Sequence, residues 1–184
     1  SDDSANVALP FSTTQTLGRP ETRDDSNHIL FNSFGSATDL FNLRRIQSDW
    51  YTELFQSGRI PLSDPYPTIW RSCEAMKSWF DGLSPNMSPQ VRTFFELNLL
   101  YSYIYILAAS PRMPFVAPFA QSLIFEHCIQ YAEKMTSHAN ERVKTAPLSF
   151  FDAMRVYMTG RQFLEVLQGN EDRLLSGIIP DPPH

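Results

Sequence analysis

The segment from Ser88 to Ala109 is apolar on nearly every face of the helix that it would form. It starts with Ser88 and Pro89, a typical helix start, because proline lacks only a hydrogen-bond donor that would be unpaired there. Alternating tyrosines in its second half would also suit a strand, but the length without a turn signal favours a helix. A helix that is hydrophobic all round belongs at the centre of a bundle. The sequence therefore predicts an all-α protein built around this segment.

Apolar residues recur at steps of three and four in other parts of the chain, as in helices with one buried face. The expected helices span about residues 36–58, 65–82, 118–138 and 149–167, with a short turn near 173–176. Asp64 before Pro65 predicts a helix cap, and Ser149 with Asp152 approximates a capping box. A polar linker is expected over 137–147. We expect an irregular multi-helix bundle of about five main helices.

Residues 1–35 are rich in Asp, Ser, Thr and Asn, contain two prolines and show little apolar periodicity. We expect them to form an extended, loop-rich lead-in that is ordered only where it lies on the rest of the molecule. Residues 36–184 are expected to form a single helical domain. Because Ser1 is not a methionine, the expectation is a piece of a longer protein.

Charge and cysteine content limit the partners and the compartment. The net charge is −5 and the basic residues are scattered, so direct contact with nucleic acid is not expected. Cys73 and Cys128 are far apart and form no C-x-x-C pair, which indicates a reduced intracellular compartment. The most apolar segment is interrupted by Glu96, Asn98 and Ser102, so no membrane span is expected.

The sequence contains no pattern typical of catalysis or cofactor binding. The glycines are too widely spaced for a dinucleotide loop or a P-loop, and no G-x-S-x-G turn occurs. His127 and Cys128 are adjacent, so on a helix their side chains diverge instead of forming a nucleophile pair. No histidine pair has the spacing of metal ligands. We predict no catalytic residue, no metal site and no cofactor in this chain, and no enzyme activity.

Aromatic residues near the centre of the expected bundle are the best candidates for an apolar pocket. They are Trp79, Phe80, Tyr101, Tyr103 and Tyr105. The alternative is that these side chains only fill the core.

Glu96 interrupts the most apolar helix and would be costly to bury alone. We expect a buried ion pair with Arg92, one helical turn away, or with Arg112 or Arg155 from a neighbouring segment. A role as a catalytic acid is the alternative.

Several short strings occur in a recognisable order. They are Leu43–Ser48 followed by Trp50 and Tyr51, the helix ending at Trp79, Tyr101–Leu107 closing on Ser110–Arg112, and Asp152–Tyr157. Their order over residues 38–168 resembles the middle homology region, the regulatory region of fungal zinc-cluster transcription factors. The start of the chain is similar to a second string of the same family, in which acidic residues precede a valine and a Leu-Pro pair. Here this string comprises Asp2, Asp3 and Val7–Pro10.

The resemblance implies a nuclear helical domain that controls transcription by RNA polymerase II in response to a co-regulator protein or a small-molecule effector. It also implies a parent protein, a monomer or a homodimer, that binds DNA and zinc through an amino-terminal six-cysteine cluster. This chain lacks those cysteines and the basic linker, so neither zinc nor DNA binding is assigned to its residues.

Two alternatives stay open. One is a free-standing small all-α enzyme or apolar-ligand carrier, with Glu96 or the pair Asp24 and Asp25 as its polar groups. The other is a truncated relative that pairs with a full-length regulator and inhibits it.

Overall fold

The structure is a computed structural model that describes residues 23–58, 60–142 and 149–177. Within these ranges the chain forms helices and no strand, with one isolated bridge between Ser110 and Met113. The α-helices are α1 (Arg23–Tyr51), α2 (Tyr66–Asp81), α3 (Pro89–Leu107), α4 (Pro118–Arg142), α5 (Phe150–Leu167) and α6 (Glu171–Leu175), and a π-helical turn, η1 (Thr52–Gln56), follows α1. The all-α multi-helix bundle predicted from the sequence is confirmed.

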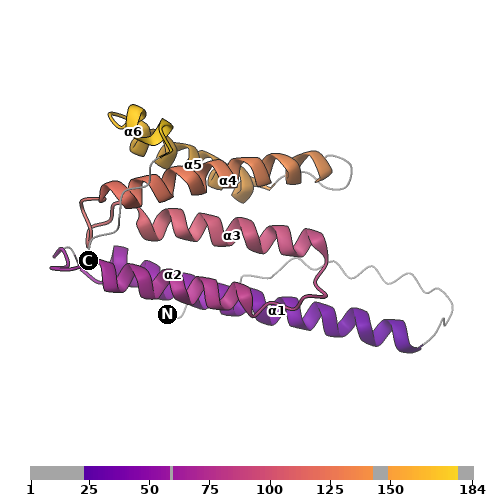
Figure 1. Ribbon diagram of the computed structural model, residues 1–184. Coiled ribbons are helices and arrows are strands. Elements are labelled where there is room, and N and C mark those ends of the chain that lie inside the picture. Colours follow the sequence, from indigo (N-terminus) through magenta and orange to yellow (C-terminus); the bar gives the residue numbers. More distant parts are fainter. Residues whose placement is uncertain (1–22, 59, 143–148, 178–184) are drawn as a thin grey trace, which may run out of the picture.

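Helix α3 lies between two layers (Figure 1), with α1 and α2 on one side and α4 and α5 on the other. It packs against all four of these helices. Its buried residues lie on every face of the helix: Phe95, Leu97, Asn98, Leu100, Ser102, Ile104, Ile106 and Leu107. The apolar segment is therefore the central helix of the bundle, as its composition predicts.

The predicted helix starts are confirmed at α3 and α5. The Ser88 hydroxyl accepts a hydrogen bond from the Val91 N–H (3.4 Å), and Ser149 with Asp152 forms a complete capping box. Helix α2 begins one residue later than predicted, because Pro65 itself is the N-cap residue. The Asp64 carboxylate still accepts a hydrogen bond from the Tyr66 N–H, at 3.1 Å.

Two predicted boundaries are wrong. Helix α1 begins at Arg23, so residues 23–35 are helical and not an extended lead-in, whereas residues 1–22 lie outside the described residues. Helix α4 continues to Arg142, so much of the predicted linker is helical. Neither extension contains a proline, and adding a residue to an existing helix costs little compared with starting one.

The end of α1 widens into the π-helical turn, which the sequence did not indicate. The Ser57 N–H donates to the Thr52 carbonyl at 2.7 Å, and the Ser57 hydroxyl donates to the Glu53 carbonyl at 2.6 Å. Leu54 at the centre of this turn is fully buried. Gly58 ends the segment, as predicted, with a φ of 140° that favours glycine.

The central position of α3 predicts a large effect of truncating a side chain there. Ile104→Ala is expected to lower the free energy of unfolding by about 2–5 kcal/mol, because it leaves a cavity in the core. The matched control is Ile60→Ala, since Ile60 is 79% exposed and its truncation should cost less than about 0.5 kcal/mol. Urea denaturation of the two variants measures the difference, and equal effects would contradict the central position of α3.

Candidate functional site

The structure brings together two of the five aromatic residues predicted to line a pocket. Tyr101 and Tyr105 lie one helical turn apart on α3, with ring centroids 4.7 Å apart. Both line a cavity of about 540 Å³ that is bordered by α1, η1, α3 and α5. Of the five residues predicted to line an apolar pocket, these two tyrosines are the ones that line this cavity.

The other three predicted residues lie elsewhere. Tyr103 packs against His127 of α4, with centroids 5.2 Å apart, because residues two positions apart on a helix point to different sides. Trp79 meets Phe95 edge to face and donates a hydrogen bond to the Asp39 carbonyl, at 3.0 Å. Phe80 packs beside Trp79. These three side chains contribute to packing between helices and do not line the cavity.

We call the 540 Å³ cavity the aromatic pocket. Its lining residues are Arg44, Gln47, Ser48, Trp50, Tyr51, Phe55, Tyr101, Tyr105, Arg155 and Met158. The lining contains two pairs of aromatic rings. At the end of α1, Tyr51 stacks on Phe55 of η1 with centroids 5.2 Å apart, and on α3, Tyr101 lies beside Tyr105. Five of these ten residues are aromatic, and a concave lining of aromatic side chains with a few polar groups is typical of a small-molecule site.

A chain of hydrogen bonds from α3 positions Arg44 at the aromatic pocket. The Arg44 guanidinium donates to the Gln47 side-chain oxygen at 2.7 Å, and the Gln47 amide donates to the Ser102 hydroxyl at 2.9 Å. The Ser102 hydroxyl in turn donates to the Asn98 carbonyl at 2.8 Å. Ser102, which interrupts the apolar pattern of α3, therefore orients a polar group of α1.

The second arginine of the pocket, Arg155 on α5, lies over the Tyr101 ring with its guanidinium carbon 5.5 Å from the ring centroid. Neither Arg44 nor Arg155 forms an ion pair with any residue that the structure describes. Burial and the nearby charge of Arg155 lower the pKa of Arg44. Within the part of the chain that the structure describes, the pocket therefore combines two like charges that take part in no ion pair.

Three aromatic residues of the pocket lining, Trp50, Tyr101 and Tyr105, carry hydrogen-bond donors. Burial raises the pKa of both Tyr101 and Tyr105, so their hydroxyls are protonated at neutral pH. The Tyr105 hydroxyl donates to the Met158 carbonyl at 3.3 Å. The indole Nε1 of Trp50, a residue only 6% exposed, is buried without a hydrogen-bond partner. Buried donors in proteins are usually paired.

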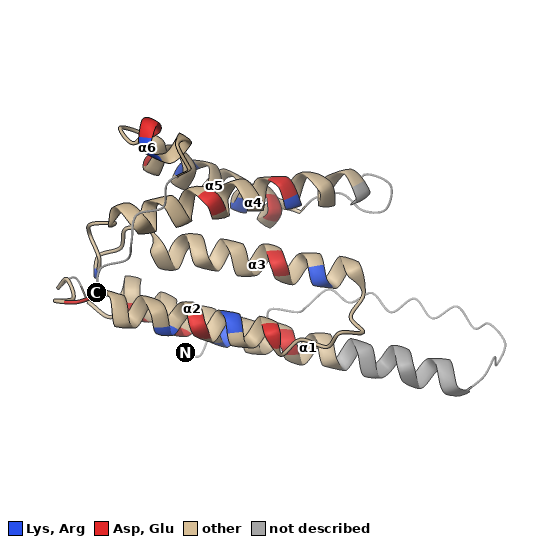
Figure 2. Ribbon diagram, viewed as in Figure 1, with Lys and Arg blue, Asp and Glu red and all other residues tan. Residues whose placement is uncertain are grey.

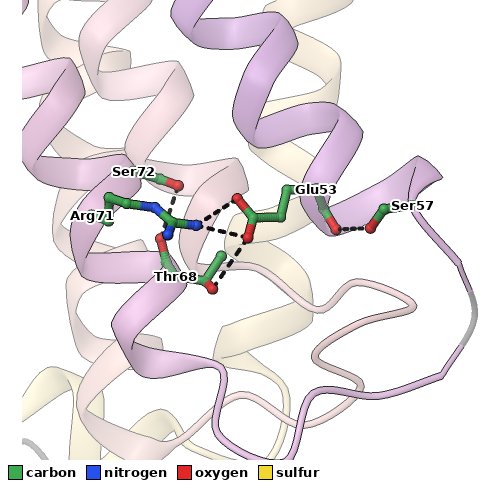
Figure 3. Close-up of polar contacts among 5 residues, drawn as sticks. All are labelled: Glu53, Ser57, Thr68, Arg71 and Ser72. Carbon is green, nitrogen blue, oxygen red and sulfur yellow. Dashed lines mark hydrogen bonds and ion pairs between the residues drawn. The ribbon is translucent and has the colours of Figure 1, made fainter.

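An ion pair fixes η1, and with it one wall of the pocket, against α2 (Figure 3). The Arg71 Nη2 atom lies 2.7 and 2.8 Å from the two carboxylate oxygens of Glu53. Thr68 donates to the same carboxylate at 3.4 Å, and Ser72 donates to the Thr68 carbonyl at 2.9 Å. The π-helical turn is thus held on its outer side by α2. π-Helical turns are frequent at functional sites.

A second cavity, of about 410 Å³, lies between α4 and α5 and is lined mostly by apolar groups, among them Cys128, Tyr131 and Phe163. The Cys128 thiol donates to the Thr159 carbonyl at 3.7 Å. Burial raises the pKa of Cys73 and of Cys128 to about 12, so both are thiols at neutral pH, and no disulfide joins them. Protonated thiols are poor nucleophiles.

Glu96 forms an ion pair, but only one of the three predicted partners takes part. Its carboxylate lies 3.8 Å from Arg92 and also pairs with Lys134 of α4. In Figure 2, the charged residues of α3 lie only in its amino-terminal half. The Glu96 side chain is 24% exposed, so the pair is half-buried and not buried as predicted.

Arg112 and Arg155 do not contact Glu96. Arg112 follows the carboxyl end of α3, which lies about 16 Å along the helix axis from Glu96. Arg155 lies over Tyr101 instead. The sequence did not identify Lys134, because the contact depends on how α3 and α4 are packed.

A double-mutant cycle tests this ion pair. Glu96→Gln and Lys134→Gln should be coupled by about 0.5–1 kcal/mol in the free energy of unfolding, and the coupling should fall at high salt. The control cycle pairs Glu96→Gln with Arg112→Gln, for which the coupling should stay below about 0.3 kcal/mol. Equal couplings in the two cycles would show that the assignment of Lys134 is wrong.

The described part of the chain contains no group of three or more His, Cys, Asp or Glu residues placed to hold a metal ion. Among the same residues, no helix is both long and apolar enough to span a membrane. Asp24 and Asp25 lie in the first turn of α1, where the side chains fall outside the described residues.

Comparison with known proteins adds no relative. No family model matches the sequence, and no curated protein or solved structure matches it significantly. The functional interpretation therefore depends on the aromatic pocket and on the resemblance of the sequence strings.

Proposed function

We propose that this chain is an effector-responsive helical regulatory domain of a fungal zinc-cluster transcription factor. The observation that supports the proposal best is the origin of the pocket residues. The strings Leu43–Ser48 with Trp50 and Tyr51, and Tyr101–Leu107, supply most of the lining, and Asp152–Tyr157 supplies Arg155. Strings far apart in the sequence that carry the family resemblance thus meet around one cavity.

The position of the pocket suggests how binding would be transmitted. The lining comes from α1 and η1 in one layer, from α5 in the other layer and from α3 between them. A molecule bound there would contact both layers and favour the arrangement of helices that fits it best. Such a ligand would shift the population between a masked and an active form of the parent protein.

The remaining parts of the proposal follow from the resemblance. The parent protein would act in the nucleus, as a monomer or a homodimer, and would bind DNA and zinc through a six-cysteine cluster. That cluster is not in this chain, whose two cysteines are buried or half-buried thiols. The partner would be the small-molecule effector itself or a co-regulator protein.

An apolar-ligand carrier is the second candidate, and the largely apolar cavity between α4 and α5 favours it. An enzyme has less support, because Glu96, the acidic residue singled out as a candidate acid, is paired with two cations and lines neither cavity.

A reporter fusion tests the regulatory proposal. The chain is placed between a heterologous DNA-binding domain and an activation segment in fungal cells, and reporter output is measured. The fusion is expected to differ severalfold in output from one without the chain. Ser48→Trp should change this output, because an indole at this lining position fills part of the pocket.

The matched control is Ser78→Trp, at an exposed position of α2 that lines no described cavity, which should leave the output unchanged. Output that is the same with and without the chain would contradict the regulatory proposal and favour the carrier. If the two tryptophan variants behave alike, the aromatic pocket is not the regulatory site.

A further inference from the structure

The described lining of the aromatic pocket carries two positive charges, at the exposed Arg44 and the half-buried Arg155. Arg44 and Arg155 both line it, and neither is paired with a described acidic residue. Two guanidinium groups that share a cavity repel each other, and a protein of net charge −5 has many acidic side chains that could have separated them. An anion bound between the two groups would relieve this repulsion.

Both arginines are held by neutral partners that leave donors available. Arg44 donates one N–H to Gln47, and the Arg155 guanidinium lies over the Tyr101 ring. A guanidinium has five N–H donors in a planar fork that matches the two oxygens of a carboxylate. The hydrogen-bond chain through Gln47 to Ser102 limits the movement of Arg44, which lowers the entropy cost of binding a ligand.

The aromatic side chains of the lining are suited to contact with an aromatic ring of a ligand. Tyr51 with Phe55, and Tyr101 with Tyr105, present aromatic surfaces from η1 and α3. The buried Trp50 Nε1 is a further donor without a partner. Aromatic walls favour a planar apolar body over a hydrated polar one. A volume of about 540 Å³ lies within the ordinary range for small-molecule sites.

We propose that the aromatic pocket binds a small aromatic carboxylate, with the carboxylate at Arg44 and Arg155 and the ring between the two pairs of aromatic side chains. This inference deepens the proposed function, on which it rests, because it names the chemical class of the effector. A phosphate ester is the less suitable ligand, since no lining residue lies in the first turn of an α-helix and half of the lining residues are aromatic.

The first test uses the unmodified chain and a fluorescent aromatic anion, 8-anilinonaphthalene-1-sulfonate, whose sulfonate takes the place of the carboxylate. The probe carries one anionic group on an aromatic body, and its fluorescence rises on binding. Unlabelled 2-naphthoate should displace it, whereas 2-naphthamide, which has the same ring but no charge, should be at least about tenfold weaker, as expected for the loss of a charge-assisted hydrogen bond.

The second test uses variants. The double variant Arg44→Gln, Arg155→Gln should weaken binding of the anionic probe about tenfold or more, and should leave binding of the uncharged N-phenyl-1-naphthylamine unchanged. The single variant Arg44→Gln should also weaken this binding, and its matched control is Arg45→Gln, which removes one positive charge from the next position of α1, outside the pocket lining. Far-ultraviolet circular dichroism shows whether each variant keeps its helices.

The outcomes separate this inference from the function on which it rests. Two outcomes would overturn the carboxylate assignment while leaving an apolar effector pocket in place. One is equal displacement of the probe by 2-naphthoate and 2-naphthamide. The other is a loss of probe binding in Arg45→Gln as large as the loss in the pocket variants. If neither fluorescent probe binds, the carboxylate assignment is overturned as well. The reporter measurement then decides the regulatory proposal independently. If the double variant does not fold, the displacement experiment on the unmodified chain decides the inference alone.

Discussion

The burial of α3 on all sides is the constraint on which the rest of the structure depends. A helix with apolar groups on every face must be covered on every face, so the remaining long helices form two layers around it (Figure 1). Several residues of α3 stay half-buried, and the aromatic pocket lies at two of them, Tyr101 and Tyr105. The helix that forms the centre of the core therefore also supplies part of the candidate site.

The few polar residues of α3 have distinct roles. Asn98 and Ser102 are fully buried, and Ser102 accepts the hydrogen bond from Gln47 that orients Arg44. Glu96 joins α3 to α4 through Lys134. A buried polar group is costly unless it is paired, and at Ser102 and Glu96 the pairing connects two helices. These contacts join α3 to one helix of each layer, to α1 through Gln47 and to α4 through Lys134.

The sequence predicted what depends on local pattern and missed what depends on packing. The central helix, the caps at Ser88 and Ser149 and the end at Gly58 follow from propensity and periodicity. The pairing of Tyr101 with Tyr105 could have been found, since residues four apart share a helix face. The π-helical turn, the Lys134 contact and the role of Gln47 could not, because each is determined by a neighbouring helix.

The central claim is that a ligand in the aromatic pocket acts on both layers at once. Hydrogen exchange of the full chain, with and without 8-anilinonaphthalene-1-sulfonate, tests it most directly. The account predicts slower exchange in residues 44–56 of α1 and η1 and also in residues 153–160 of α5, with no change in α6. Protection confined to α4 and α5, with none in residues 44–56, would place the ligand in the other cavity and contradict the account.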